Sequence, residues 1–152
     1  MSIDIAGIVA AVQSHAQAAG SIETVVTSEP KSAPGTGISA AIWVSDISPA
    51  GPASGLAAMS VVLTLMVRVM KPMVSQPYGQ IDSDLLEAVD ELMTAYAGAF
   101  TLGGEVRNVD LFGMYGSAMA AKAGYLQLDK GLLRVMDITL PLVLDDVWAE
   151  VA

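Results

Sequence analysis

Few side chains in this sequence could carry chemistry, and most of them are carboxylates. Asp145 and Asp146 are adjacent and could hold Mg²⁺ together with Asp137 or Glu150, because this cation prefers oxygen ligands. Neighbouring residues on a strand point to opposite faces, so the pair does not converge on one ion by itself. The pattern is more typical of the charged end of a strand, and we expect no metal site.

His15 is the single histidine, and the chain has no cysteine. A zinc site needs more nitrogen or sulfur ligands than this, so we expect His15 to be a solvated or packed helix residue. Residues 34–37 and 103–104 contain glycine but lack the motifs of a P-loop or a dinucleotide site. No Gly-x-Ser-x-Gly nucleophile elbow is present. The sequence therefore predicts no catalytic residue, no cofactor and no enzyme activity.

A row of acids at Asp84, Glu87 and Glu91 lies on a predicted helix. Such a row is usually a solvated helix face, and its early members also interact favourably with the helix dipole. A second interpretation is an acidic lining for a pore, with Asp145 and Asp146 as a further candidate group. The sequence leaves both interpretations open.

The first half of the chain predicts one helix and three strands. Apolar residues at helical spacing predict a helix over residues 2–19, which Ser2 can cap and Gly20 can end. The strands are rich in β-branched and apolar residues, and Pro, Gly and Ser mark two loops that we expect to be flexible. The strands are expected at residues 22–27, 38–47 and 58–70, and the loops at residues 28–37 and 49–55.

The second half predicts another helix and three more strands. Asp82 is the expected N-cap of a helix that Gly98 ends, and Ile81 is expected to pack onto Leu86 as a hydrophobic staple. Pro141 cannot donate a backbone hydrogen bond, which places part of the last strand at an edge or a bulge. The buried helix stripe is expected at Leu85, Val89, Leu92, Met93 and Tyr96, and the strands at residues 105–112, 122–128 and 132–144.

These elements follow the order αβββαβββ, which predicts a single α+β domain over residues 1–152. The expected architecture is an antiparallel sheet with the two helices packed to one side. Apolar residues make up 53% of the chain and charged residues only 15%, against about 25% charged in typical soluble domains. The last strand is apolar on much of both faces. The sequence therefore predicts an obligate oligomer in which another copy of the chain covers part of the apolar surface of the last strand.

Charge and hydropathy narrow the class of protein further. Sixteen acidic and seven basic residues give a net charge of −9, which argues against nucleic-acid binding as the main role. The longest apolar stretch, residues 56–67, has about 12 residues, whereas a membrane helix needs about 20. No basic segment precedes an apolar one at the N-terminus. We expect a soluble protein made in the cytoplasm, with no membrane partner.

A family resemblance lies in the final hairpin. The ending Ala123-Gly-Tyr-x-x-x-Asp-x-Gly-x-x-Arg-Val-x-Asp-Ile-x-x-Pro-Leu-Val-Leu144, together with the order αβββαβββ and the two loops, resembles the tail terminator proteins of long-tailed bacteriophages. These proteins are also called minor tail or tail-completion proteins. The order of elements resembles this family over nearly the whole chain, and the residue pattern covers about 25 residues.

The resemblance implies a structural virion protein of the tail or neck, assembled in the host cytoplasm. It implies a ring, usually a hexamer, that caps the tail tube and joins it to the head-closure or connector protein. DNA would cross the lumen in transit. The family has no catalytic residues, so none are transferred to this chain.

Three other interpretations remain open. Head-closure and tail-tube proteins share small α+β folds and a similar composition, so the position within the particle could differ. A small-ligand binding module would show a pocket and ligand-dependent melting. A metal-dependent enzyme built on Asp137, Asp145 and Asp146 would respond to Mg²⁺ or Mn²⁺.

Overall fold

The computed structural model describes residues 4–20, 22–27, 37–49, 58–72, 81–99, 101–104, 106–114, 116–128 and 131–149. Ser2, Glu150 and nearly all of the two loops expected at residues 28–37 and 49–55 lie outside these ranges. The side chain of Asp146 is also outside the description. No helix among the described residues is both long enough and apolar enough to cross a membrane.

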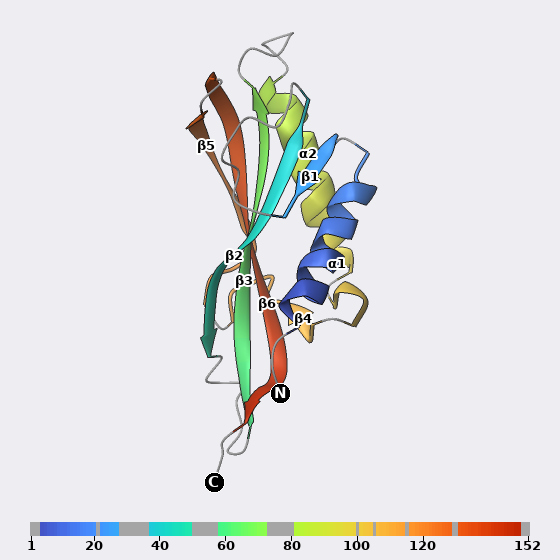
Figure 1. The fold of residues 1–152 in the computed structure, drawn as a ribbon, viewed down its shortest axis with the longest axis vertical. Helices are drawn as coiled ribbons and strands as arrows, with labels where there is room; N and C mark the ends of the chain where they lie inside the picture. Colours follow the sequence, from blue (N-terminus) through green and yellow to red (C-terminus); the bar gives the residue numbers. More distant parts are fainter. Residues whose placement is uncertain are drawn as a thin grey trace.

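Six strands form one curled sheet in the order β1-β2-β3-β6-β4, with β5 also paired to β6 (Figure 1). Every pairing is antiparallel except that of β1 with β2, which is parallel. The connection between those two strands is about a dozen residues long, enough for a parallel crossover, whereas a tight hairpin would have forced an antiparallel pair. The strands are β1 (Thr24–Val26), β2 (Ser39–Pro49), β3 (Ala58–Pro72), β4 (Asn108–Val109), β5 (Ala120–Leu128) and β6 (Gly131–Ala149).

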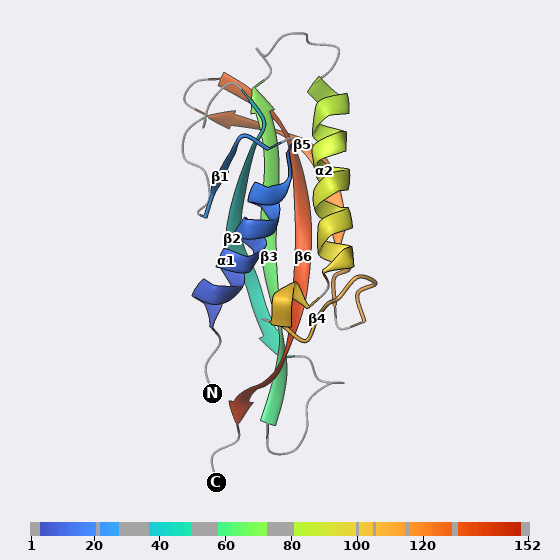
Figure 2. The ribbon, with the colours of Figure 1, turned by 90° about the vertical axis from the view of Figure 1, so that its right-hand side faces the viewer.

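Two helices, α1 (Ile5–Ala18) and α2 (Ile81–Gly98), lie on the same face of this sheet (Figure 2). The predicted α+β class and the order αβββαβββ are confirmed. Asp4 caps α1, since its carboxylate accepts a hydrogen bond from the backbone N–H of Gly7 at 3.1 Å. The core between helices and sheet is built from Ile8, Val12 and Ala16 of α1, the buried stripe of α2, and alternate residues of β2, β3 and β6.

The α2 stripe follows the predicted spacing, with Leu85, Val89, Leu92 and Tyr96 all buried. The predicted hydrophobic staple is wrong. The helix already begins at Ile81, which is 2% exposed, while Leu86 is 55% exposed and does not share its buried face. Residues five positions apart on a helix do not stack, as the 3.6-residue repeat requires.

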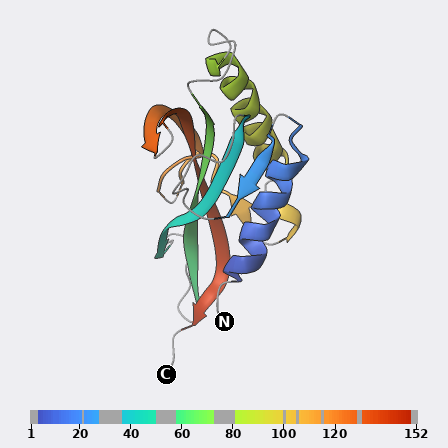
Figure 3. The same ribbon diagram turned by 45° about the horizontal axis from the view of Figure 1, so that its top comes forward.

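Part of the long central strands is buried on both faces within one copy of the chain, whereas Thr64, Met66 and Thr139, on the face away from the helices, are half-buried. On the face away from the helices, Met70, Leu133 and Val135 form a second cluster, against which Trp43 of β2 and Leu126 of β5 pack. This cluster lies near the end of β3 and the start of β6, and Figure 3 shows the β5–β6 hairpin bending away from the helices. The expectation that another copy is needed to cover the last strand is therefore wrong for these residues.

Pro141 lies where β6 changes partner on one side. The ladder with β5 stops at Thr139, and the ladder with β4 starts at Leu142. The Pro141 carbonyl accepts a hydrogen bond from the N–H of Asp110 at 2.9 Å. The Pro141 nitrogen, which has no hydrogen to donate, lies on the same side of β6, in the gap between β5 and β4. The predicted local interruption is confirmed, although the other side of β6 pairs with β3 at this point.

The strand expected over residues 105–112 is much shorter in the structure, where β4 has only two residues. A 3₁₀ helix, η3 (Leu102–Gly104), precedes it, and the chain turns directly after it. The N–H of Leu111 bonds back to the carbonyl of Val109 at 3.0 Å, and the Asp110 carboxylate accepts from the N–H of Met114 at 2.9 Å. This local bonding replaces the ladder bonds that a longer strand would have made.

Candidate assembly surface

Two acids of the row on α2 have hydrogen-bond partners on neighbouring elements. Lys71 of β3 donates to Asp84 at 2.9 Å, and the backbone N–H of Gly20 donates to Glu91 at 3.0 Å. Glu87 is exposed and has no hydrogen-bond or ion-pair partner among the described residues. The three acids share one flank of the helix, as predicted, but only Glu87 keeps its carboxylate free for another molecule.

Asp145 accepts hydrogen bonds from the Ser60 hydroxyl at 2.8 Å and from the Arg107 guanidinium at 3.2 Å. It therefore has structural partners instead of a second carboxylate. Asp137 lies eight residues earlier on the extended strand β6, which is a separation of about 26 Å. The two acids cannot share an ion, and the described residues contain no group of three side chains able to hold a metal.

His15 is a packed helix residue, as expected. Its Nδ1 is 2.8 Å from the Ala11 carbonyl, and its ring centroid is 6.1 Å from that of Tyr96. The Tyr96 hydroxyl donates to the Val12 carbonyl at 3.2 Å, tying α2 to α1. Burial raises the pKa of the Tyr96 phenol well above its usual value, which keeps this donor neutral.

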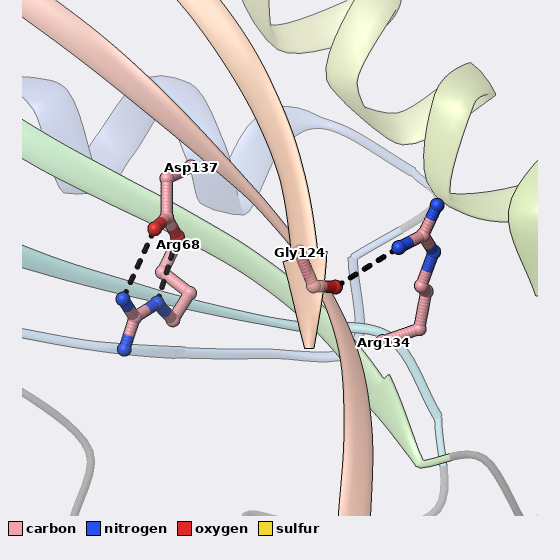
Figure 4. Close-up of polar contacts among 4 residues, drawn as sticks. All are labelled: Arg68, Gly124, Arg134 and Asp137. Carbon is pink, nitrogen blue, oxygen red and sulfur yellow. Dashed lines mark hydrogen bonds and ion pairs between the residues drawn. The ribbon is translucent and has the colours of Figure 1, made fainter. Parts of the chain in front are cut away.

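Arg68 and Asp137 form an ion pair across β3 and β6, on the face that lacks helices (Figure 4). Two guanidinium nitrogens donate to the two carboxylate oxygens at 2.7 and 3.0 Å. The Arg68 side chain also lies over the Trp43 ring, 5.1 Å from its centroid. Side-chain exposures of 17% and 27% make this a partly buried, bidentate contact.

Arg134 joins the final hairpin to α2. Its Nε donates to Asp82 at 3.0 Å, and another guanidinium nitrogen donates to the Gly124 carbonyl at 3.1 Å, the bond drawn in Figure 4. Its guanidinium carbon is 4.4 Å from the centroid of the Tyr125 ring. Arg134 and Asp137 are the arginine and the second aspartate of the pattern at residues 123–144. Their contacts with α2, β5 and β3 give both residues an architectural role.

Sequence reasoning missed the partners of these two residues. Arg68 is 69 positions from Asp137, and Asp82 is 52 positions from Arg134. No local spacing signals such a pair. The only available clue was the isolated charge within an apolar strand, which predicts a partner without naming it.

Several large apolar side chains remain exposed to solvent. They fall outside the two buried clusters and lie mainly on the turn after β4 and around the β5–β6 hairpin. They are Ile5, Ile47, Leu86, Phe112, Met114, Tyr125 and Leu132. The surplus apolar surface expected from the composition therefore exists, but most of it lies outside the last strand, to which only Leu132 of these residues belongs.

Comparison with known proteins finds likenesses among solved structures. No family model matches the chain, and neither does any curated protein. A chain in a solved structure described as "Virion of native gene transfer agent (GTA) particle" aligns over 95% of this chain and 99% of its own, with 14% identity and a TM-score of 0.48. At these values the likeness is a partial similarity of shape and assigns neither family nor function.

Proposed function

We propose that this chain is a structural virion protein of the tail terminator type. The observation that carries the proposal is the pattern at residues 123–144 within the order αβββαβββ. This pattern forms the β5–β6 hairpin, in which Arg134 bonds to α2 and Asp137 bonds to β3. Contacts of this kind support a rigid hairpin that a neighbouring subunit can pack against.

The surface favours assembly over ligand binding or catalysis. A hollow of about 380 Å³ beside residues 107–114 is open to solvent. Buried ligand sites are usually enclosed and combine apolar walls with a few convergent polar groups. The exposed apolar side chains instead suit contacts between proteins.

The proposed assembly is a ring, with a hexamer as the first choice from the resemblance. It caps the tail tube, meets the head-closure or connector protein, and lets DNA pass through its lumen. In this proposal Glu87 is the leading lumen residue, with Asp84, Glu91, Asp145 and Asp146 as further candidates. Like charge keeps a polyanion from binding to the wall during transit.

Mass photometry and negative-stain imaging of the purified chain at micromolar concentration test this proposal. We expect closed rings, either alone or after addition of tail tube. A monomer at every salt concentration, with and without tail tube, would contradict it. Ring formation by a ligand-free sample would also separate the proposal from a small-ligand binding module, whose melting temperature would depend on ligand instead.

A further inference from the structure

Two exposed apolar features lie beside different points of β6. The first is a projecting turn, here called the hook, which consists of residues 110–114. Phe112 and Met114 at its tip are 87% and 75% exposed. Such exposure of two large apolar side chains in one short turn is costly unless another molecule covers them.

The hook is held in shape by its own buried base. Asp110 is 2% exposed, its N–H donates to the Pro141 carbonyl, and its carboxylate accepts from the Met114 N–H. Gly113 has a φ of +72°, which other residues rarely adopt. The apolar tip is therefore presented in a preformed conformation, which lowers the entropic cost of binding.

The second feature is a small groove between α2 and the β5–β6 hairpin. It has a volume of about 80 Å³, roughly half that of a cavity of ~150 Å³ that holds a benzene ring. Because the groove is open on one side, it suits part of one aromatic or thioether side chain. It is lined by Leu85, Leu86, Ala123 and Met136, with Asp82 and Arg134 at its polar edge.

The hook of one copy cannot enter the groove of the same copy. β4, which leads into the hook, pairs with Leu142 and Val143 of β6, whereas the groove contains Arg134 and Met136 of the same strand. Six to nine extended residues separate these points by about 20–30 Å. The two features are thus parts of different surfaces, as a head-to-tail contact requires.

Charge indicates the occupant of the groove. Arg107 stands beside the hook, and its ion pair with Asp145 is nearly half exposed on both sides and therefore weak. The groove includes Asp82, an exposed acid on α2. A second copy of this chain would bring its apolar tip to the apolar groove and its Arg107 close to Asp82.

We propose that the hook of one copy docks at the groove of the next copy, with Phe112 inserted beside Leu86. Repetition of this head-to-tail contact closes a ring when its rotation permits. The inference rests on the proposed ring function and names the contact that would build it.

Cysteine cross-linking tests the contact directly, because the chain has no cysteine of its own. Phe112→Cys protein is mixed with Leu86→Cys protein and oxidised, and non-reducing gels should show a disulfide-linked heterodimer. The matched control mixes Ile47→Cys with Leu86→Cys, since Ile47 is also exposed but lies on β2. A heterodimer in the control alone, or in neither mixture, overturns the inference.

Assembly measurements provide a second test. Phe112→Ser should raise the concentration of half-assembly at least about tenfold, whereas Ile47→Ser should leave it unchanged. Leu86→Asp should act like Phe112→Ser. When these two variants are mixed, the intact hook of the Leu86→Asp protein can still dock in the intact groove of the Phe112→Ser protein. We therefore expect heterodimers and no rings.

The outcomes separate this inference from the proposed function. Normal rings from Phe112→Ser overturn the hook contact and leave the ring proposal standing. A wild-type chain that never forms rings contradicts both. A wild-type particle of only two copies, disrupted by both variants, overturns the head-to-tail geometry.

Discussion

Asp137 and Arg68 show how one polar pair can be accommodated in an apolar sheet. Both side chains are mostly buried, and each satisfies the other through two hydrogen bonds of 2.7 and 3.0 Å. Trp43 covers the guanidinium from one side. Removing one partner would leave a poorly solvated charge, which costs more than the intact pair contributes.

We therefore expect Asp137→Asn to lower the free energy of unfolding by about 1–3 kcal/mol. Urea denaturation followed by circular dichroism measures this change. Asp90→Asn is the matched control, because Asp90 is an exposed acid on α2 and its loss should change stability by less than about 0.5 kcal/mol.

The double variant Arg68→Met with Asp137→Leu should recover much of the stability lost in Asp137→Asn, because apolar side chains of similar volume can replace a buried pair. Equal stability of Asp137→Asn and wild type would show that the pair contributes little.

At the scale of elements, the sequence predicts what depends on local periodicity. The helix α2 and its buried Leu85 and Tyr96 follow from the 3.6-residue repeat, and the interruption at Pro141 follows from its missing donor. The length of β4 could not be predicted, because the Asp110 side chain competes for backbone bonds only once the turn has formed. The pairing of Arg134 with Asp82 depends on the distant packing of a hairpin on a helix.

Gly113 is the glycine whose backbone conformation matters most for the hook. Its φ is +72°, and an added Cβ would lie 2.7 Å from the Gly116 carbonyl oxygen. We expect Gly113→Ala to destabilise the protein by about 1–3 kcal/mol, as measured by thermal or urea unfolding. Gly98→Ala is the control, because it ends α2 with no atom within 4 Å of an added Cβ. It should be neutral or stabilising by up to about 1 kcal/mol, and equal losses in both variants would contradict this account.

At the scale of the whole molecule, charge on the proposed lumen wall can be tested without disturbing the fold. Glu87→Lys removes no contact with a described residue, whereas substitution of Asp84 or Glu91 would break an existing one. We expect normal unfolding and ring formation from Glu87→Lys. In assembled particles we expect slower DNA ejection or lower infectivity, because lysines facing the lumen would bind phosphates. Asp46→Lys, an exposed acid on β2, serves as the control, and unchanged ejection in the Glu87 variant would place this flank of α2 outside the lumen.

The pairing of β3 with β6 also sets the order in which the subunit can fold. Ser60 and its partner Asp145 are 85 positions apart, and every other element is synthesised before β6. Until β6 emerges from the ribosome, β3 has an open edge and apolar side chains on both faces. Contacts this distant in sequence form slowly, and the waiting intermediate exposes surface that promotes aggregation. Production of this subunit in quantity should therefore depend on how well the cell protects the unfinished sheet, through slower translation, lower temperature or chaperones.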